Sequence, residues 1–399
     1  MTLFDSIEML PDDPIFGLVP LFNADTRPEK INLSVGSYKD SDGKALVLTA
    51  VRKAEEKILE QQLNKEYQPI DGDPTYRHET LKLIFGESSF LVKNEGVYAA
   101  QTVGASGALR IGAEFLHQRG IKTIAVSTPT WSNHLALLGR GGLEILKYSY
   151  YDEKIHDIDF AKMCDSIREL PRNSAILLHG CCHNPTGIDP TIEQWKELSK
   201  IIKECSLVPF FDFAYQGFKE ELDLDAQGIR IFAEDGHQML VAYSYSKNFG
   251  LYGERAGALC AVTHDKEIST KVQSNIKKII RGSYSSPSLQ SARIVKTVLT
   301  TPELKSEWIE ELANMRNRIF DTRNALIAKL HANGNIGDFQ FMNKQRGMFG
   351  FMGLAKDQVL MLQNEHAIYM PSSGRINIAG LNPHNIVTFI EALKEVSHG

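Results

Sequence analysis

The sequence contains little that would place the protein in a membrane or on a nucleic acid. No stretch reaches the roughly 18 apolar residues that a membrane-spanning helix needs. The first residues are acidic and lack the basic start and apolar core of a secretory signal, and they do not resemble a transit peptide. The net charge of −5 comes from interspersed acidic and basic residues. We therefore expect no membrane and no nucleic acid as a partner.

Cysteine is scarce, with 5 in 399 residues. An odd number of cysteines in a large chain favours reduced thiols in a cytosol-like compartment, so we expect a cytoplasmic protein. Cys181 and Cys182 stand beside His183, but a second pair of ligands at metal-binding spacing is lacking. We expect these cysteines to pack as small apolar residues and predict no metal site.

Repeats, low-complexity linkers and a Gly-x-Gly-x-x-Gly after a strand are also absent. The last absence counts against a dinucleotide-binding dehydrogenase, which the strand and helix pattern would otherwise suit. A chain of 399 residues is too long for one ordinary core, and it predicts about two domains.

The middle of the chain alternates short apolar runs with amphipathic segments. A helical segment at 191–205 follows a threonine that is able to cap it. Short, apolar runs bounded by Gly, Pro or Asn predict buried strands at 123–129, 175–180, 207–215, 239–246 and 256–263. This alternation predicts an α/β fold with a mostly parallel sheet covered by helices on both faces. Ligands of such sheets bind at the carboxyl ends of the strands.

The two ends of the chain differ from the middle. A helical pattern over about 303–333, flanked by Pro302 and Gly334, leads into shorter strand-like and helical pieces. We expect residues 311–399 and 13–45 to form a smaller α/β domain, with residues 46–310 as the large domain. Residues 1–12 look like an extended arm.

The segment 244–255, SYSKNFGLYGER, carries the most information. It follows a predicted strand, so Lys247 should lie at a strand's carboxyl end. A desolvated lysine near another cation has a lowered pKa and can form a Schiff base with an aldehyde. Ser244, Ser246 and Arg255 supply phosphate-binding groups around it, and Gly250 and Gly253 allow tight turns that bring Arg255 back.

This segment resembles the lysine motif of class I aminotransferases, Ser-x-Ser-Lys-x-x-Gly-Leu-x-x-x-Arg. The similarity extends from 32–44 to 373–381 and is closest to the aspartate aminotransferase branch. The resemblance implies fold type I, pyridoxal 5′-phosphate (PLP) as cofactor, and Lys247 as the residue that carries it. It also implies a large PLP-binding domain.

The phosphate of the cofactor needs donors, which small residues at a helix start can provide. The pattern at 101–116 places Ser106 at such a start. The resemblance implies that Ala105, Ser106 and Arg255 bind this phosphate. It also implies that Tyr67 reaches the phosphate in the other subunit.

Asp212 lies in the apolar run 210–218, where a carboxylate is costly without a cationic or hydrogen-bonding partner. The resemblance gives it the protonated pyridine nitrogen as that partner, supported by His134. Trp131 follows a predicted strand, and an aromatic side chain there is able to stack on a flat heteroaromatic ring; in the family, the matching tryptophan stacks on the pyridine ring.

Asn184 belongs to the turn-like sequence Asn-Pro-Thr-Gly at a strand end. The resemblance implies that Asn184 and Tyr215 hydrogen-bond to the phenolic oxygen of the cofactor. His179 is expected in the second layer around it. Lys247, Asp212 and Tyr215 are thus the expected catalytic residues.

Substrate recognition is assigned to two arginines. Taken singly, each arginine is more often a surface or ion-pairing residue, but a pair that clamps two carboxylates would select dicarboxylic amino acids. By resemblance, Arg375 in a predicted strand binds the α-carboxylate. Arg281 binds the side-chain carboxylate from the neighbouring subunit. Further expected substrate contacts come from Gly36, Ser37, Trp131 and Asn184.

If Tyr67, Arg281 and Ser285 act across subunits, the active unit is a homodimer. Tyr284 stands where many family members have tryptophan, and Ser286 where they have asparagine. These departures bear on the choice of the substrate side chain.

The resemblance implies ping-pong transamination between L-aspartate and 2-oxoglutarate through the Schiff base of Lys247, giving oxaloacetate and L-glutamate. An aromatic amino acid aminotransferase is the nearest alternative, because it shares nearly all these residues. A decarboxylase or lyase on the same scaffold, and a non-catalytic PLP carrier, remain as other readings. Amino acids and keto acids are the expected small-molecule partners.

Overall fold

The computed structural model describes residues 3–332 and 337–398. Its strands are β1 (Ile31–Asn32), β2 (Val97–Val103), β3 (Thr123–Thr128), β4 (Glu144–Ser149), β5 (Tyr151–Asp152), β6 (Asp157–Ile158), β7 (Ala175–His179), β8 (Val208–Phe213), β9 (Met239–Ser244), β10 (Ala256–Val262), β11 (Phe349–Phe351), β12 (Ile368–Tyr369) and β13 (Arg375–Asn377).

Its helices are α1 (Leu18–Ala24), α2 (Thr49–Glu60), α3 (Pro74–Phe85), α4 (Phe90–Lys93), α5 (Gly104–Gln118), α6 (Asn133–Gly139), α7 (Phe160–Arg168), α8 (Ile192–Glu204), α9 (Leu222–Asp225), α10 (Gln227–Glu234), α11 (Lys266–Ser283), α12 (Leu289–Thr300), α13 (Pro302–Ala332), α14 (Lys356–His366) and α15 (Ile386–His398), with 3-10 helices η1 (Gln340–Lys344) and η2 (Ile378–Gly380).

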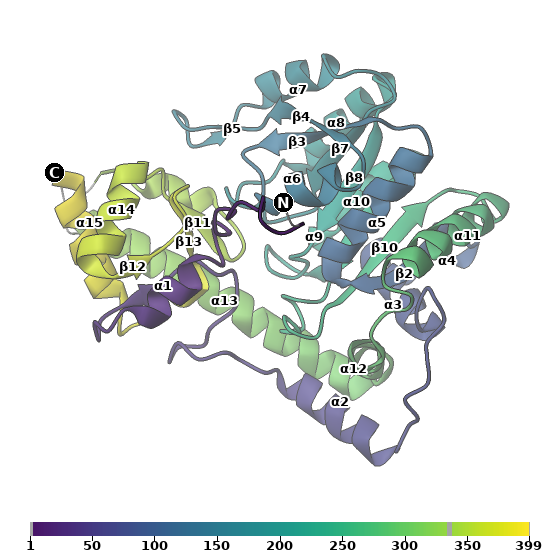
Figure 1. Ribbon diagram of the computed structural model, residues 1–399, viewed down its shortest axis with the longest axis horizontal. Helices are drawn as coiled ribbons and strands as arrows, with labels where there is room; N and C mark the ends of the chain where they lie inside the picture. The colour runs from purple at the N-terminus through teal and green to yellow at the C-terminus, as the bar shows by residue number, and fades with distance from the viewer. Residues whose placement is uncertain (1–2, 333–336, 399) are drawn as a thin grey trace.

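A seven-stranded sheet in the order β2-β10-β9-β8-β7-β3-β4 forms the centre of the larger body (Figure 1). Its inner strands pair in parallel, and β10 alone in this sheet runs antiparallel to both of its neighbours, β2 and β9. The five predicted strands are present as β3, β7, β8, β9 and β10. The sequence pattern did not identify the edge strands β2 and β4. The expected α/β fold with a mostly parallel sheet is confirmed.

Two hydrophobic clusters cover the two faces of this sheet. Side chains alternate between faces with a period of two, so on β8 Phe210 packs with α5 and α11, whereas Phe211 and Phe213 pack on the opposite face. Asp212 therefore shares the face of Phe210 and α5. In the register of the sheet, His179 lies opposite Asp212 on the neighbouring strand.

The smaller body joins both ends of the chain. β1 pairs in parallel with β12, and β11 pairs with β13. In Figure 1 the purple α1 lies beside the yellow C-terminal elements, and α13 runs from that body to α12 beneath the sheet. The helix predicted over about 303–333 begins at Pro302, the residue expected to flank it; its expected end at 333 and the flanking Gly334 lie outside the described residues.

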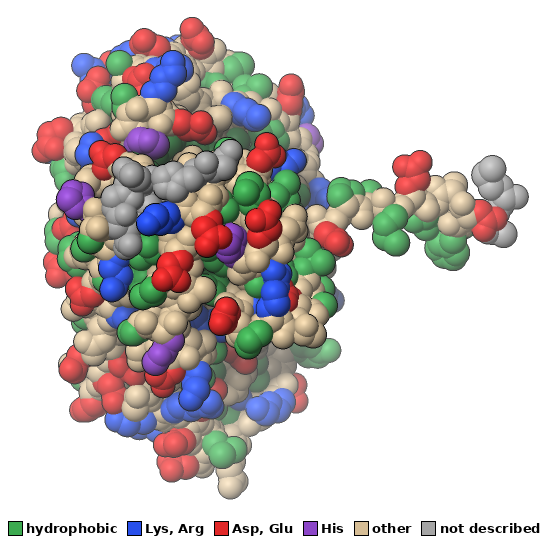
Figure 2. Space-filling view, turned by 90° about the vertical axis from the view of Figure 1, so that its left-hand side faces the viewer, with side chains coloured by type: hydrophobic (Ala, Val, Ile, Leu, Met, Phe, Trp, Pro, Cys, Tyr) green, Lys and Arg blue, Asp and Glu red, His purple; other side chains and the backbone are tan. Residues whose placement is uncertain are grey.

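The N-terminal segment projects from the rest of the molecule (Figure 2). It exposes a series of apolar side chains, Leu3, Phe4, Ile7, Met9 and Leu10. Apolar side chains left in water along an extended segment are typical of a surface that another chain covers.

Candidate active site

A cavity of about 630 Å³ opens where β7, β8 and β9 end and α5 begins. Its walls contain most of the side chains that the sequence pointed to. They are Gly36, Ser37, Ala105, Ser106, Trp131, His179, Asn184, Asp212, Tyr215, Ser244, Ser246, Lys247, Arg255 and Arg375. The ends of parallel strands and a helix N-terminus thus meet at one place, as such sheets require of a binding site.

Lys247 lies three residues beyond the end of β9, deep in the cavity. Its Nζ donates to the carbonyl of Gly36 at 2.8 Å. Burial, and then the positive charges of Arg375 and Arg255, lower the pKa of Lys247 from 10.5 to about 8. A substantial fraction of this amine is therefore neutral near physiological pH, which is the form that attacks an aldehyde.

Asp212 has one satisfied and one free oxygen. Its Oδ2 lies 3.0 Å from Nε2 of His134, whereas its buried Oδ1 has no hydrogen-bond partner among the described residues. Behind His134, Thr130 Oγ1 contacts Nδ1 of that ring at 2.8 Å and Nε2 of His179 at 3.2 Å. A buried acceptor without a donor is costly, so the free oxygen fits a cationic N–H of a bound ligand.

His179 differs slightly from expectation, because its ring lines the cavity instead of lying behind it. Burial, and then the neighbouring His134, lower the pKa of His179 from 6.5 to about 3. This ring is therefore neutral at physiological pH.

The start of α5 and the loop after β9 form one end of the cavity. Arg255 donates from Nη1 to Ser246 Oγ at 3.3 Å and to the carbonyl of Tyr252 at 3.0 Å. Gly104 is required here: its φ is +65°, and a Cβ would lie 2.5 Å from Nη2 of Arg255. Free amides of the helix N-terminus, hydroxyls and a guanidinium together form an anion site.

The turns around Arg255 partly follow the sequence prediction. Gly250 has a φ of +64°, in the left-handed region, as a tight turn there requires. Gly253 does not adopt this conformation, and Arg255 does so itself, with a φ of +55°. The need for Gly253 inferred from the sequence was therefore wrong, and Arg255 adopts the left-handed turn conformation in its place.

Arg375, on β13, also lines the cavity and is 3% exposed. It donates to Asn184 Oδ1 at 3.2 Å and to the carbonyl of Ser34, and its guanidinium lies 4.1 Å from the ring centre of Phe349. Burial lowers the pKa of Arg375 to about 10, so it stays charged. Among the described residues no ion pair neutralises it, and its Nε lacks a partner, which suits a ligand carboxylate.

Tyr215 and Trp131 complete the walls. Burial raises the pKa of Tyr215 far above its ordinary value, so its hydroxyl remains a donor. Trp131 contacts the edge of His134, with ring centres 5.2 Å apart. An aromatic side chain, a hydroxyl donor, Asn184 and the free oxygen of Asp212 thus line one cavity.

Three predicted residues lie outside the cavity. Tyr67 is 91% exposed. Arg281 lies in the last turn of α11 and donates to Ser285 Oγ on the surface. The single chain thus does not bring Tyr67, Arg281 and Ser285 to the other site residues.

Sequence reasoning missed several lining residues, namely Ile15, Phe16, Val35, Asn133, Cys181, Ala214, Tyr252 and Phe349. Most are apolar and carry no chemical signal in the sequence. For Phe349 the signal was indirect: a glycine at position 36 leaves room for a side chain to approach. In the structure the ring of Phe349 does so, and a Cβ at Gly36 would lie 2.6 Å from its Cζ.

Within residues 3–332 and 337–398, no group of three or more His, Cys, Asp or Glu side chains is arranged to hold a metal ion. No helix in the same part of the chain is both long and apolar enough to cross a membrane.

Known proteins resemble this chain over its whole length. The aspartate aminotransferase of Escherichia coli K12 is 45% identical over 395 residues, which cover 99% of this chain and 100% of that protein. The mitochondrial aspartate aminotransferase of Gallus gallus is 40% identical over 394 residues, 98% of this chain and 93% of that protein.

Solved structures agree with this result. The aromatic-amino-acid aminotransferase of Burkholderia pseudomallei, covalently bound to pyridoxal phosphate, has a TM-score of 0.96 and 44% identity, covering 99% of this chain and 100% of its own. The aspartate aminotransferase from Saccharomyces cerevisiae cytoplasm has a TM-score of 0.97 and 36% identity, covering 99% and 98%. The fold is therefore fold type I. The family model for aminotransferase class I and II matches residues 28–393, and the chain belongs to this family.

Proposed function

We propose that this protein transfers the amino group of L-aspartate to 2-oxoglutarate, with PLP as its cofactor, giving oxaloacetate and L-glutamate. The observation that carries the proposal is that one cavity contains both Lys247, with its lowered pKa of about 8, and a carboxylate oxygen of Asp212 that has no partner. Full-length relatives with the name aspartate aminotransferase support the choice of substrate.

PLP fits the residues present. Lys247 would bind its aldehyde, and the free Oδ1 of Asp212 would accept the ring N–H. Ala105, Ser106, Ser244, Ser246 and Arg255 would hold the phosphate, Trp131 would stack on the ring, and Asn184 and Tyr215 would contact the phenolic oxygen. When bound, PLP withdraws electrons from the carbon that carries the amino group.

The protein's own groups then bind substrate and move one proton. Arg375 binds the α-carboxylate and so orients the α-carbon. Once the amine of the substrate has displaced it from the aldehyde carbon, the freed Lys247 Nζ would take the α-proton and return it to that carbon, a role that its lowered pKa suits. Asp212 would keep a positive charge on the ring nitrogen of the cofactor, and the Tyr215 hydroxyl would donate to the phenolic oxygen. The first keto acid would leave before the second binds in the same cavity, so we expect ping-pong kinetics.

We propose that the active unit is a homodimer in the cytoplasm. Tyr67, Arg281 and Ser285 lie on the surface, outside the cavity of their own chain. In a dimer, Arg281 would bind the side-chain carboxylate in the partner's cavity, and Tyr67 would reach the partner's phosphate. The apolar N-terminal segment of Figure 2 would cover the partner as well. Residues 13–45 and 311–399 would form the small domain, and 46–310 the large one.

A second candidate is an aromatic amino acid aminotransferase. The solved structures similar to this chain include enzymes of that name, and Ile15, Phe16 and Phe349 give the cavity an apolar side. Comparing turnover of aspartate with that of phenylalanine and tyrosine separates the two. A preference for the aromatic substrates would reverse the order of the candidates.

The experiment that tests the proposed function starts from the purified protein loaded with PLP. We expect visible absorbance that changes when aspartate is added, and release of oxaloacetate. Lys247→Ala should abolish keto-acid exchange, while Lys200→Ala, an exposed lysine on α8, should leave it unchanged. Near-normal transamination by Lys247→Ala would contradict the role of this amine.

A further inference from the structure

Two carboxylates lie buried directly behind the cavity without forming part of its wall. The side chain of Asp189 is 3% exposed, and Asp225 is 2% exposed. Burying two negative charges close together is costly. Their contacts explain where that cost is offset.

Asp189 holds the turn that leads into Asn184. Its Oδ2 accepts the backbone N–H of Cys182 at 2.8 Å, and its Oδ1 accepts that of His183 at 2.9 Å. Cys182 has a φ of +51°, a left-handed conformation that is unfavourable for a side chain such as cysteine. The two hydrogen bonds hold the backbone in this conformation immediately before Asn184.

Asp225, at the end of α9, holds the turn that follows Tyr215. Its Oδ2 accepts the backbone N–H groups of Gly217 at 2.8 Å and Lys219 at 3.0 Å, and its Oδ1 accepts that of Glu220 at 2.9 Å. Gly217 has a φ of +91°, and a Cβ on it would lie 2.4 Å from Leu312. This tight turn begins two residues after Tyr215.

Lys219 joins the two carboxylates. Its amide donates to Asp225, and its Nζ lies 3.8 Å from Oδ2 of Asp189. Burial raises the pKa of Asp225 to about 6 against the effect of its three N–H donors. Although burial lowers the pKa of Lys219, the neighbouring acidic groups, Asp189 first and Asp225 among them, together raise it overall. Lys219 therefore links the two turns, through its backbone N–H to Asp225 and through its amine to Asp189.

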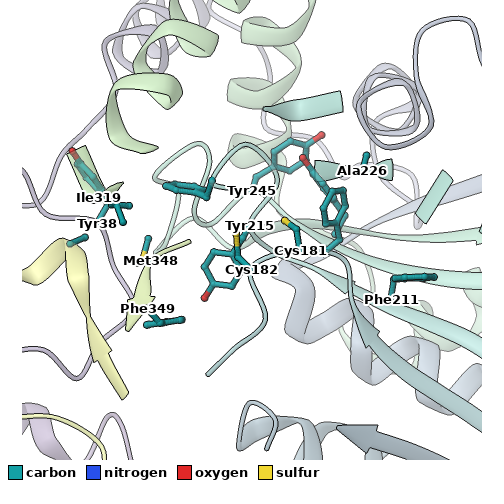
Figure 3. Packing of buried hydrophobic residues seen from close by; sticks show 14 of the residues in the cluster. Tyr38, Cys181, Cys182, Phe211, Tyr215, Ala226, Tyr245, Ile319, Met348 and Phe349 are labelled. Carbon is teal, nitrogen blue, oxygen red and sulfur yellow. The ribbon is translucent and has the colours of Figure 1, made fainter. Parts of the chain in front are cut away.

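The two turns come from neighbouring parallel strands and meet at one point. Figure 3 shows Cys181 and Cys182 next to Tyr215. Cys181 lines the cavity, and its Sγ lies 3.9 Å from Oδ2 of Asp225. The two buried carboxylates therefore bind the backbone of the two turns that lead to Asn184 and away from Tyr215, both of which line the cavity.

We propose that Asp189, Asp225 and Lys219 are positioning residues that hold Asn184 and Tyr215 in place for one ligand oxygen. The inference rests on the proposed function, in which that oxygen is the phenolic oxygen of PLP. None of the three residues touches the ligand. They act on the reaction through the direction in which Asn184 and Tyr215 point.

The test measures the absorbance of enzyme-bound PLP against pH in the holoenzyme. The midpoint of this titration falls when donors stabilise the phenolic oxygen in its charged form. In Asp189→Asn and Asp225→Asn, an amide N–H₂ faces backbone N–H donors, so each turn should loosen. We expect each midpoint to rise by about one pH unit, the size of shift that losing one such hydrogen bond gives.

Lys219→Met is a milder change that the fold should tolerate, because the side chain of Lys219 is 25% exposed. We expect a smaller rise of the midpoint in this variant. Asp159→Asn is the control. Asp159 also accepts a backbone N–H, that of Lys162, but it does so at the start of α7, a helix that packs against the edge strand β4. Thermal melting of all variants separates general destabilisation from positioning.

Midpoints of the Asp189, Asp225 and Lys219 variants equal to that of the Asp159 control would overturn the inference and leave the proposed function intact. Wild-type protein that takes up no PLP would instead refute the proposed function. Should Asp225→Asn not fold, Asp189→Asn and Lys219→Met decide the outcome by the same measurement.

Discussion

At the scale of single residues, the cavity is defined by polar groups without protein partners. Asp212 Oδ1 and Arg375 Nε are buried and unpaired, and Arg255 and Lys247 lie near the same space. Unpaired buried groups are costly, and at the wall of a cavity a ligand is able to supply the missing partner. These atoms indicate where charge of a ligand belongs: positive beside Asp212 and negative beside the arginines.

The free amine of Lys247 leads to a prediction about pH. In the apoenzyme its pKa is about 8 because of burial and then of Arg375 and Arg255, so the unfolded chain binds this proton more tightly. The charged amine therefore destabilises the folded apoenzyme below pH 8, and the penalty fades as pH rises towards 10.5. A shift of this size corresponds to about 3 kcal/mol.

We expect the apoenzyme of Lys247→Met to melt at a higher temperature than the wild type at pH 7, with the difference shrinking above pH 8. Lys200→Met, at an exposed position, serves as the control and should show no such trend. A difference that stays constant between pH 7 and 10 would contradict the lowered pKa of Lys247.

At the scale of elements, the site depends on close approaches between backbones. Gly257 on β10 has no room for a side chain, because a Cβ would lie 2.5 Å from the carbonyl carbon of Gly104. This contact places the first turn of α5 against the sheet. The anion site formed by Ala105, Ser106 and Arg255 is therefore built by β10 as well as by α5.

The N-terminus of α2 is capped by a side chain of another helix, α13. Glu311, on α13, accepts the N–H of Thr49 at 2.6 Å and that of Ala50 at 3.0 Å. These amides have no partner within α2 itself, and a carboxylate at a helix N-terminus is favourable. A glutamate about 260 residues away in the sequence thus acts as the cap of this helix.

We predict that Glu311→Ala destabilises the protein by about 1–2 kcal/mol, as the loss of a helix cap typically does. Thermal melting should show this as a decrease of a few degrees. Glu310→Ala, at the exposed neighbouring position, is the control. Equal melting temperatures for the two variants would show that the contacts of Glu311 contribute nothing to stability.

At the scale of the whole molecule, the proposed dimer makes a quantitative prediction. Lys247→Ala removes the amine from a chain's own cavity, whereas Arg281→Asp removes the arginine from its partner's cavity. Each variant alone should be nearly inactive on aspartate. In a mixed dimer one cavity carries both changes and the other carries neither, so subunit exchange should restore activity.

Random exchange of equal amounts makes half of the dimers mixed, each with one intact cavity, so we expect about a quarter of the wild-type activity. The measurement is oxaloacetate formation after the two inactive proteins are mixed and allowed to exchange subunits. If exchange is shown to occur and activity stays at the level of the separate variants, Arg281 does not act across the interface.

Local patterns of the sequence predicted a large part of this architecture. Strands β3, β7, β8, β9 and β10 are buried on both faces and therefore appear as continuous apolar runs. The edge strand β4 is half exposed, so it lacks that signature. β2 is buried, but in its sequence VYAAQTV the apolar run is broken by Gln101 and Thr102, whose side chains donate to the carbonyls of Ser288 and Gly104.

The sequence by itself determined the fold class and, through the motif around Lys247, the residues that gather at the cavity, because a motif records chemistry that needs fixed residue types. Only the tertiary structure decided which atoms remain unpaired, that Phe349 lies against Arg375, and that Asp189 and Asp225 hold the turns behind Asn184 and Tyr215. Burial, pKa and hydrogen bonding depend on residues far apart along the chain, and folding alone brings these together.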